Sequence, residues 1–513
     1  MSTTDDSTNQ QRQKENDEDF IQFYGGKLIS SVPLVIFVIW SIVQTAVFQV
    51  SDTNGLVVGS VFSLLIGMVF VKGPIVPYAN AIFEGMAQRV VATAIIALMW
   101  ALMFANILQS GNFVQGLVWT ALNINVGGSL FPAVTFILTA VFGLAVGTSF
   151  GTAVTFTTLF YPAGILLGSN PLLLFGAILS GAILGDHLAP VSDTTIVSAV
   201  TQSADIGGVV ASRFKYVLLA VIPTVLLYAL AGMVLPGVSI AGDTSKILAQ
   251  NSNPIGLVHL CSLGIVIYLA IKGRHILVTI STGILVATIL NIGLGLAKIS
   301  DLFLLTIPEN VWSSGFSTII PFVTVGSSTG ISGAIYSGVT GAFSTSILLL
   351  LILAMTQIMS NGGVFELILN WIVENVKTVK SAELAIVGSS AVLNSFFVVH
   401  TSAEIILGPY ISQLGKRFNV NGYRRANLLD TPLAGVAAFF PWAGPVLLGY
   451  GVMSGTLVQD YSWFTKEIVV NTAYIAPFVF YGWFVLIAII ASALTGFGRE
   501  YTTDDLPEEV SRI

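Results

Sequence analysis

The residues best suited to chemistry lie close together at positions 181–200, GAILGDHLAPVSDTTIVSAV. Two carboxylates, Asp186 and Asp193, stand on either side of Pro190 in a largely apolar stretch. Proline has no backbone N–H and clashes with the carbonyl four residues earlier. The sequence therefore predicts an unwound segment over 185–195, followed by a half-helix that begins near Ser192 or Asp193. Freed carbonyls and carboxylates offer the oxygen ligands that hard cations prefer, so this segment is a candidate cation site.

Each polar side chain of this segment has an expected role in binding Na⁺. Asp193 is expected to ligate the ion and carry the proton, and Asp186 to be the second ligand or to orient the site. The hydroxyls are expected to be neutral ligands, with helix capping as the alternative: Ser192, Thr194 and Thr195. His187 titrates near neutral pH when unperturbed, which makes it a candidate pH sensor, although a lone histidine is more often structural.

Composition places these acids in a membrane. The chain has 513 residues, 54% hydrophobic and 9% charged, and its mean hydropathy is +0.87. Soluble domains carry about 25% charged residues, and the nearly charge-free runs match the roughly 20 apolar residues that a helix needs to cross a bilayer. The sequence thus predicts an all-α polytopic membrane protein. Acids at membrane depth are costly and are functional candidates: Glu84, Asp186, Asp193, Glu404 and Asp430. For Glu84, beside a basic loop, the alternative is a position at the membrane interface.

Other classes of function are disfavoured by the sequence. It contains no GxxxxGK[ST] phosphate loop, which argues against ATP-driven pumping. It shows no nucleophile–base pair and no metal-ligand cluster, so we expect neither an enzyme nor a cofactor, and nothing suggests a nucleic-acid partner. The single cysteine, Cys261, excludes an internal disulfide. The acidic start is unlike a signal peptide, and the polar ends 1–27 and 495–513 are expected to be cytosolic tails.

Basic residues in short loops set the expected orientation, because cytosolic loops are rich in Lys and Arg. With Lys27 in the cytosol, the apolar spans place the other basic loops on the same side: Lys72, Arg89, Arg213, Lys215, Lys272, Arg274, Lys377, Lys380, Lys416, Arg417, Arg424 and Arg425. We therefore expect a multi-pass protein of the plasma (inner) membrane with both termini in the cytosol.

A weak internal repeat divides the chain in two. Residues 105–119, ANILQSGNFVQGLVW, are similar to residues 356–371, TQIMSNGGVFELILNW. The two copies are seven predicted crossings apart, an odd number, so they would have opposite orientations. The expected halves are 28–236 and 254–494, with a connecting loop over 237–253. Inverted repeats of this kind build many secondary transporters, which bind substrate where the repeats meet.

The second half contains candidates for the same site. Its counterpart to 181–200 is 427–445, with Asp430, Trp442 and three prolines in a second broken region. Residues 394–410 supply further polar side chains: Asn394, His400, Thr401, Ser402 and Glu404. In the first half, AVGTSFGTAVTFTT (145–158) includes Thr148, and its glycines are expected to allow close approach between two spans, with ordinary small-residue packing as the alternative.

These motifs resemble the NhaC family of Na⁺/H⁺ antiporters. GTSFGT (147–152) and GDHLAPVSDTT (185–195) are similar to the family patterns GTSWGT and GD-K-x-SP-x-SDTT. The resemblance implies a secondary transporter of the ion-transporter type, with inverted repeats, broken helices and a homodimeric assembly. The chain departs from the pattern at His187 and Ala189, where the family has lysine and serine. In 429–443 it lacks one expected acid and one expected amide, and Glu404 is an additional acid.

From these residues we expect exchange of cytosolic Na⁺ or Li⁺ for H⁺ across the lipid bilayer. Burial in a cavity disfavours a charged carboxylate, so Na⁺ and H⁺ would compete for the same oxygens. The alternative is Na⁺-coupled transport or exchange of an organic acid or amino acid, whose carboxylate would face half-helix N-termini near 192 and 441–445. The altered second half and the Gly-rich stretch 325–341 favour that alternative. A channel ranks below both.

Overall fold

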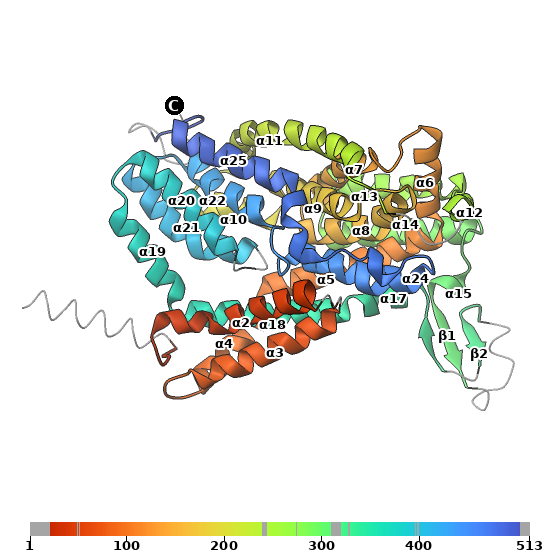
Figure 1. The fold of residues 1–513 in the computed structure, drawn as a ribbon, viewed down its shortest axis with the longest axis horizontal. Coiled ribbons are helices and arrows are strands. Elements are labelled where there is room, and N and C mark those ends of the chain that lie inside the picture. The colour runs from red at the N-terminus through yellow and green to blue at the C-terminus, as the bar shows by residue number, and fades with distance from the viewer. Residues whose placement is uncertain are drawn as a thin grey trace, which may run out of the picture.

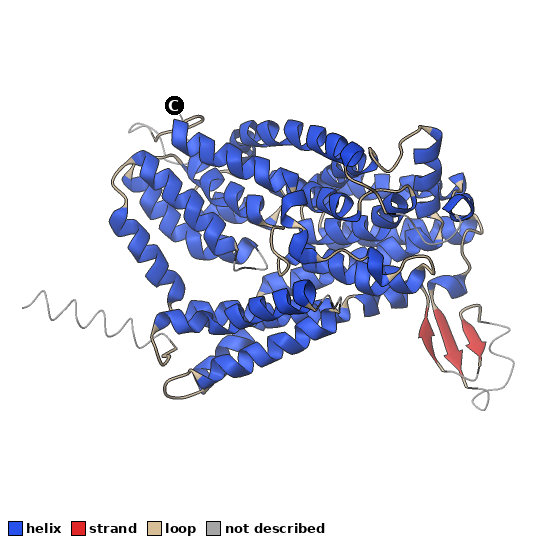
Figure 2. Cartoon of the chain, viewed as in Figure 1, coloured by secondary structure: helices blue, strands red, loops and turns tan. Residues whose placement is uncertain are grey.

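The computed structural model describes residues 21–48, 50, 52–238, 244–272, 274–308, 320–326, 329–395, 397 and 400–502. Helices make up most of this part of the chain (Figure 2). The ends of the predicted tails, 1–20 and 503–513, and part of the predicted connecting loop, 239–243, lie outside the described residues.

The helices of the first part follow one another with short connections. Their bounds are α2 Val32–Ile42, α3 Thr53–Val69, α4 Val76–Met86, α5 Arg89–Ser110, α6 Phe113–Asn123, α7 Phe131–Val146, α8 Ser149–Leu166, α9 Pro171–Leu188, α10 Asp193–Thr201, α11 Ile206–Val234 and α12 Thr244–Gln250. Side-chain caps fix several starts: Asn170 accepts the N–H of Leu173 at the start of α9, and Asp205 accepts that of Gly208 at the start of α11.

The second part contains the remaining helices and a small sheet. The helices are α13 Leu260–Ile271, α14 Ile276–Gly293, α15 Ile299–Leu302, α17 Ala334–Gly341, α18 Phe343–Asn361, α19 Val364–Asn375, α20 Val379–Asn394, α21 His400–Arg417, α22 Gly422–Val436, α23 Gly444–Gly451, α24 Val458–Asp460 and α25 Phe480–Thr495. Short 3₁₀ turns occupy Lys27–Ser31, Pro254–His259, Lys466–Ile468, Thr472–Tyr474 and Ala476–Phe478, and π-helical turns occupy Val43–Val47 and Val452–Leu457.

The helices confirm the prediction of an all-α polytopic membrane protein. Within the part of the chain that the structure describes, five helical stretches are long and apolar enough to cross a bilayer: Lys27–Thr45, Val91–Ser110, Pro171–Leu188, Ile206–Val234 and Ala334–Asn361. The surface of α11 is apolar, with Leu226, Leu230 and Val234 exposed at a spacing of one helical turn. A stripe of this kind suits contact with lipid.

The helices form groups that can be followed in Figure 1. α2, α3, α4 and α18 pack together in the lower layer of that view, while α9, α10, α11, α22 and α25 pack above them. α7 and α9 pack along their lengths, and Gly143 and Gly185 meet there, because a Cβ at Gly185 would lie 2.5 Å from the Gly143 backbone. The glycine at 185 therefore allows these two helices to pack closely.

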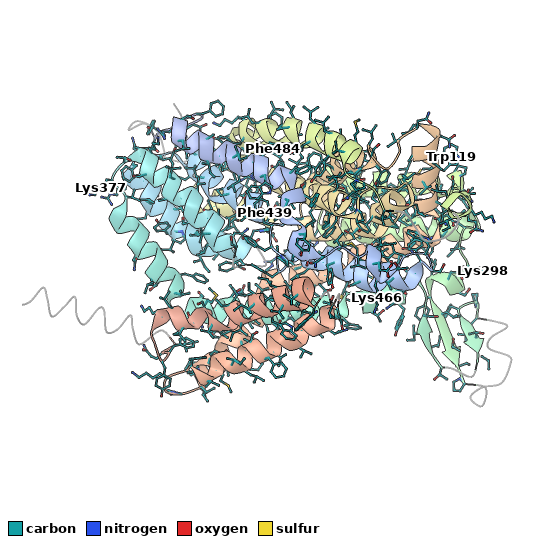
Figure 3. All side chains as sticks on the ribbon, viewed as in Figure 1. Trp119, Lys298, Lys377, Phe439, Lys466 and Phe484 are labelled. Atoms are coloured by element: carbon teal, nitrogen blue, oxygen red, sulfur yellow. The ribbon has the colours of Figure 1, made fainter. Side chains whose placement is uncertain are left out.

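Interrupted helices converge near the middle of the molecule. α7 ends at Gly147, whose φ of +71° suits glycine, and α8 begins two residues later. α9 and α10 are separated by residues 189–192, and α22 and α23 by residues 437–443. Phe439, labelled in Figure 3, lies in the last of these interruptions. Its ring stacks on that of Trp483 with centroids 4.4 Å apart.

Both predicted unwound regions are shorter than the sequence suggested. α9 continues to Leu188, because the N–H of Ala189 bonds to the carbonyls of Gly185 and Asp186 and closes the last turn before Pro190. Asp186 is therefore in a helix, and its carbonyl is already used. In the second half α22 runs through Pro432 to Val436, which places Asp430 in a helix as well.

A three-stranded sheet was not predicted. It consists of β1 Leu304–Ile307, β2 Val323–Val325 and β3 Gly330–Ser332 in the order β2-β1-β3, with β1 parallel to β2 and antiparallel to β3. It lies at the edge of the molecule, at the lower right of Figure 2, and leads into α17. The Gly-rich stretch 325–341 thus supplies part of this sheet and the following helix.

Candidate functional site

Asp186 lies in the last turn of α9, where donors from two other elements hold its carboxylate. The backbone N–H of Ser149, the first residue of α8, donates to Oδ2 at 3.0 Å, and the hydroxyl of Ser192 donates to Oδ1 at 2.6 Å. Ser192 is the N-cap residue of α10, so the carboxylate faces the N-termini of two helices, where negative charge is favoured. Gly147 packs on the 189–192 segment, since a Cβ there would lie 2.7 Å from Val191. Two interruptions therefore meet at one buried carboxylate.

Two cavities meet at Asp186. The ion-sized cavity has a volume of about 10 Å³, close to the space that one water molecule needs. It is lined by Ser149, Ile183, Asp186, His187, Thr194, His400, Asp430, Ala434 and Ala437. The wide cavity, of about 540 Å³, shares Asp186, Thr194 and His400 with the ion-sized cavity. It extends from Asp186 past Asp193 to the basic side chains Arg89 and Arg274.

A buried arginine from α11 joins the two halves of the site. Arg213 is fully buried, and its Nη2 lies 2.5 Å from Oδ2 of Asp430. Its other donors reach the hydroxyl of Thr195 at 2.9 Å, Oδ1 of Asn427 at 3.0 Å and the backbone carbonyl of His187. The guanidinium thus ties the end of α9 and the start of α10 to α22.

Glu404 adds a third acid. It is fully buried in α21, and no donor among the described residues hydrogen-bonds to either of its carboxylate oxygens. Asp430 lies within hydrogen-bonding reach, and electrostatic interactions with Arg213 and Asp186 also act on Glu404. Asp430 and Glu404 thus interact with the Arg213 guanidinium, and Asp186 interacts with both of these acids. The cluster therefore has two negative charges in excess when all its groups are ionised. At membrane depth such an excess requires a proton or a cation.

His187 and His400 line the ion-sized cavity from opposite halves. His187 is held between the hydroxyls of Tyr481, at 2.8 Å from Nδ1, and Thr431, at 3.3 Å from Nε2. His400 begins α21, stacks on Phe150 with centroids 6.3 Å apart, and lies 3.2 Å from the amide nitrogen of Asn394. Nothing in this geometry tests the prediction that His187 senses pH.

The structure brings some of the predicted ligands together and separates others. Ser192 bonds to Asp186, and the hydroxyl of Thr194 lies 3.0 Å from that of Ser192. Both residues line the wide cavity, and Thr194 also lines the ion-sized one; their role as ion ligands stays a prediction. Thr195 instead accepts from Arg213. Asp193 is exposed in the wide cavity and does not line the ion-sized one. The second carboxylate at the ion-sized cavity is Asp430.

The other candidates have mainly supporting positions. Thr148 is the N-cap residue of α8 and lines the wide cavity. Asn394 donates to the carbonyl of Leu433 at 2.8 Å, and the indole of Trp442 donates to the carbonyl of Ser395 at 2.8 Å, so both fasten the interruptions of the second half. Glu84 is exposed and accepts a hydrogen bond from Asn361 at 2.8 Å, away from the site, and its position at the membrane interface stays a prediction.

Sequence reasoning missed Arg213. It counted this residue, with Arg424 and Arg425, among the basic loops, but all three side chains are fully buried. A signal existed: Arg213 stands seven residues inside α11, two helical turns beyond its capping residue, where a loop charge is not expected. Removing the buried arginines from the loop count leaves the predicted orientation resting on the other basic residues.

The arrangement is suited to one small cation with oxygen ligands. The ion-sized cavity offers the Asp186 and Asp430 carboxylates and the hydroxyl of Thr194. Within the described residues no group of three His, Cys, Asp or Glu side chains is placed to hold a metal ion. Carboxylate and hydroxyl oxygens without imidazole or thiolate ligands suit a hard ion more than a transition metal.

Known proteins similar to this chain are transporters. A 172-residue segment is 30% identical to the malate-2H⁺/Na⁺-lactate antiporter of Bacillus subtilis and covers 34% of this chain and 36% of that protein. A 69-residue segment, 14% of this chain and 15% of the relative, is 38% identical to an uncharacterized Na⁺/H⁺ antiporter of Haemophilus influenzae. Over 387 residues, 74% of each chain, the identity to the arginine/ornithine antiporter ArcD of Halobacterium salinarum is 23%. The aligned part of the chain thus spans about a third of the first relative's length.

The family model covers far more of the chain than these alignments. It is described as the Na⁺/H⁺ antiporter family, and it matches residues 21–233 and 202–483. The first matched segment runs from α2 through nearly all of α11 and includes Asp186 and Arg213; the second runs from α11 to the start of α25 and includes Glu404 and Asp430. The chain belongs to the Na⁺/H⁺ antiporter family.

Proposed function

We propose that this protein is a secondary active transporter that exchanges cytosolic Na⁺ or Li⁺ for H⁺ across the plasma membrane. The observation that carries the proposal is the position of Asp186, whose buried carboxylate stands between a wide cavity and a cavity of ionic size. Membership of the Na⁺/H⁺ antiporter family supports the same reaction.

In this mechanism Na⁺ enters through the wide cavity and binds between Asp186 and Asp430, with the hydroxyl of Thr194 as a neutral ligand. The Ser149 N–H and the Ser192 hydroxyl hold the Asp186 carboxylate in place. The cluster of three acids and Arg213 holds excess negative charge, so crossing the membrane without a cation or a proton is costly. Na⁺ and H⁺ therefore substitute for each other, and the protein switches access only when one of them is bound.

The test is transport into vesicles that hold a pH gradient. We expect Na⁺ or Li⁺ alone to dissipate the gradient, and we expect the Asp186→Asn variant to lose this activity by about 100-fold, since it removes a charged ligand. Glu84→Gln is the control, because Glu84 is an exposed carboxylate that lines neither cavity. Wild-type activity in Asp186→Asn would refute the site.

A second candidate function is Na⁺-coupled transport or exchange of an organic acid or amino acid. The wide cavity favours it, because about 540 Å³ is far more than Na⁺ needs, and Arg89 and Arg274 offer guanidinium groups for a carboxylate. Two of the similar proteins are named for organic solutes. If the pH gradient or Na⁺ uptake responds only when malate, lactate or arginine is added, this candidate replaces simple Na⁺/H⁺ exchange.

We also propose that the protein is a homodimer with both termini in the cytosol. The positions of Lys72, Arg89 and Arg274 at the ends of helices support this orientation. Labelling of single cysteines at these positions from either side of the membrane tests the orientation. Crosslinking in native membranes tests the dimer.

A further inference from the structure

A second polar cavity lies away from the Asp186 site. It has a volume of about 370 Å³ and is formed where α3, α17, α18, the π-helical turn Val452–Leu457 and α24 meet. Its lining is rich in hydroxyls and amides and includes two acids: Asp52, Thr53, Asn54, Tyr336, Ser337, Thr340, Gly341, Ser344, Thr345, Gly451, Ser454, Gly455, Thr456, Gln459 and Asp460. These lining residues include no lysine, arginine or histidine. We call this the Thr345 cavity.

Three threonines in this cavity have unused hydroxyls. Thr53, Thr345 and Thr456 are each at least nine-tenths buried, and their hydroxyls make no hydrogen bond within the described part of the chain. Threonines in helices of this protein commonly donate to the carbonyl one turn earlier, as Thr356 does to Ile352 at 3.1 Å. Their oxygens are not among the fully enclosed unpaired atoms, so they are open to the cavity, where a ligand or water can bind them.

Glycines keep space open beside these hydroxyls. A Cβ at Gly451 would lie 2.6 Å from the Thr345 hydroxyl and 4.0 Å from that of Thr53, and a Cβ at Gly341 would lie 3.2 Å from that of Thr456. Gly451 directly precedes the π-helical turn that carries Thr456, a rare conformation that is frequent at functional sites. The hydroxyls thus converge on a space that a larger residue would fill.

The Thr345 cavity and the wide cavity lie at opposite ends of α5. Arg89, the first residue of α5, lines the wide cavity. Gln109, near the other end of α5, donates to Asp460 in the Thr345 cavity at 3.3 Å. Twenty residues of helix span about 30 Å, which is the thickness of the hydrocarbon core. The two cavities therefore face opposite sides of the membrane.

We propose that the Thr345 cavity binds a small monovalent cation at the membrane face opposite to the wide cavity. The hydroxyls of Thr53, Thr345 and Thr456 supply neutral oxygen ligands, and Asp52 and Asp460 supply negative charge at the rim. Na⁺ and the ammonium group of an organic solute share this chemistry. The inference rests on the proposed function only in taking the bound cation to be the transported one.

The first test measures transport separately from each side, in right-side-out and inside-out vesicles. We expect Thr345→Val to raise the Na⁺ concentration for half-maximal transport about fivefold on the side of the Thr345 cavity, by loss of one hydroxyl ligand, and to leave the other side unchanged. Thr356→Val is the matched control, because Thr356 is equally buried in α18 but bonds to its own helix. No shift on either side, or equal shifts on both sides, would overturn the proposal.

The second test does not depend on transport. Purified Asp186→Asn protein lacks the proposed transport site but keeps the Thr345 cavity, so we expect NaCl or ethylammonium chloride to raise its melting temperature relative to choline chloride. Adding Thr345→Val should remove that increase. Stabilisation by Na⁺ identifies an inorganic cation, and stabilisation by ethylammonium alone identifies an organic one. If neither salt stabilises Asp186→Asn, the Thr345 cavity is not a cation site, whatever the outcome for Asp186.

Discussion

Two buried charge clusters lie close together in this protein and are built in opposite ways. In the Glu383 cluster, Arg424 donates to Glu383 through Nε at 2.9 Å and Nη2 at 3.0 Å, and Arg499 donates to the same carboxylate at 2.8 Å. In the Asp186 cluster, Arg213 is the one guanidinium that the described residues offer to Asp430 and Glu404, and Asp186 interacts with both of these acids. The first has more cations than acids, and the second has more acids than cations.

We interpret the difference as one between a structural cluster and the proposed transport site. Every oxygen of Glu383 receives charged hydrogen bonds, and Arg424 also donates to Tyr216 and Ser492, so this cluster needs no further ion. Glu404, by contrast, receives no hydrogen bond from the described residues. Burial alone therefore does not identify a functional acid. The balance of charge and of hydrogen-bond donors around it does.

The largest expected effect is on stability, in the Glu383 cluster. Glu383→Gln removes the charge that compensates the buried Arg424, so we expect the free energy of unfolding to fall by about 3–5 kcal/mol. Thermal unfolding in detergent measures this. Glu500→Gln is the control, because Glu500 pairs with the partly exposed Lys215 at 2.9 Å, and its loss should cost less than about 1 kcal/mol. A melting temperature of Glu383→Gln equal to wild type would contradict the structural assignment.

Arg213→Gln should make the Asp186 cluster depend on added ions. Without the guanidinium, three acids share one buried site, and we expect a loss of about 3 kcal/mol in Na⁺-free buffer. Na⁺ should restore part of this loss, so the melting temperature of the variant should rise with Na⁺ more steeply than that of wild type. Parallel Na⁺ dependence in the two proteins would show that Arg213 does not share the cation site.

Glu404→Gln should not lower the free energy of unfolding as Glu383→Gln does. It removes a buried charge that lacks a donor, so we expect stability to stay level or to rise by about 1 kcal/mol. Na⁺-dependent dissipation of the pH gradient should fall by about 10-fold, because the cluster loses one of its acids. Destabilisation as large as that of Glu383→Gln would remove the distinction between the two clusters.

Asp193→Asn should have the smallest effect. Asp193 is exposed in the wide cavity, where solvent screens its charge, so we expect the Na⁺ concentration for half-maximal transport to change by only about two- to threefold. The measurement is the Na⁺ dependence of transport by Asp193→Asn, compared with that of Asp186→Asn. Complete loss of transport in Asp193→Asn would instead support the primary role that the sequence suggested for it.

Local chemistry could be predicted from the sequence, but long-range pairing could not. Pro190 marked the interruption because a proline ring changes the backbone at its own position. Ser192 could be placed beside the interruption because it is only two residues from Pro190. The partner of Asp186 across the ion-sized cavity is Asp430, which is 244 positions away, and no local pattern encodes that distance. Arg213 looked like a loop residue because composition cannot show which helix covers it. Asp193 lines the wide cavity and not the ion-sized one, and spacing alone does not tell which carboxylate faces inward.

The direction of the hydrogen bond between Ser192 and Asp186 depends on whether Asp186 is protonated. A hydroxyl has one proton, so while Ser192 donates to the ionised Asp186, it must accept from Thr194, 3.0 Å away. Protonation of Asp186 at Oδ1 reverses both bonds: Asp186 donates to Ser192, and Ser192 donates to Thr194. The lone pairs of Thr194, which lines both cavities, then point differently toward an incoming ion. One rotating hydroxyl thus conveys the protonation state of a buried carboxylate to the residue that meets the next ion.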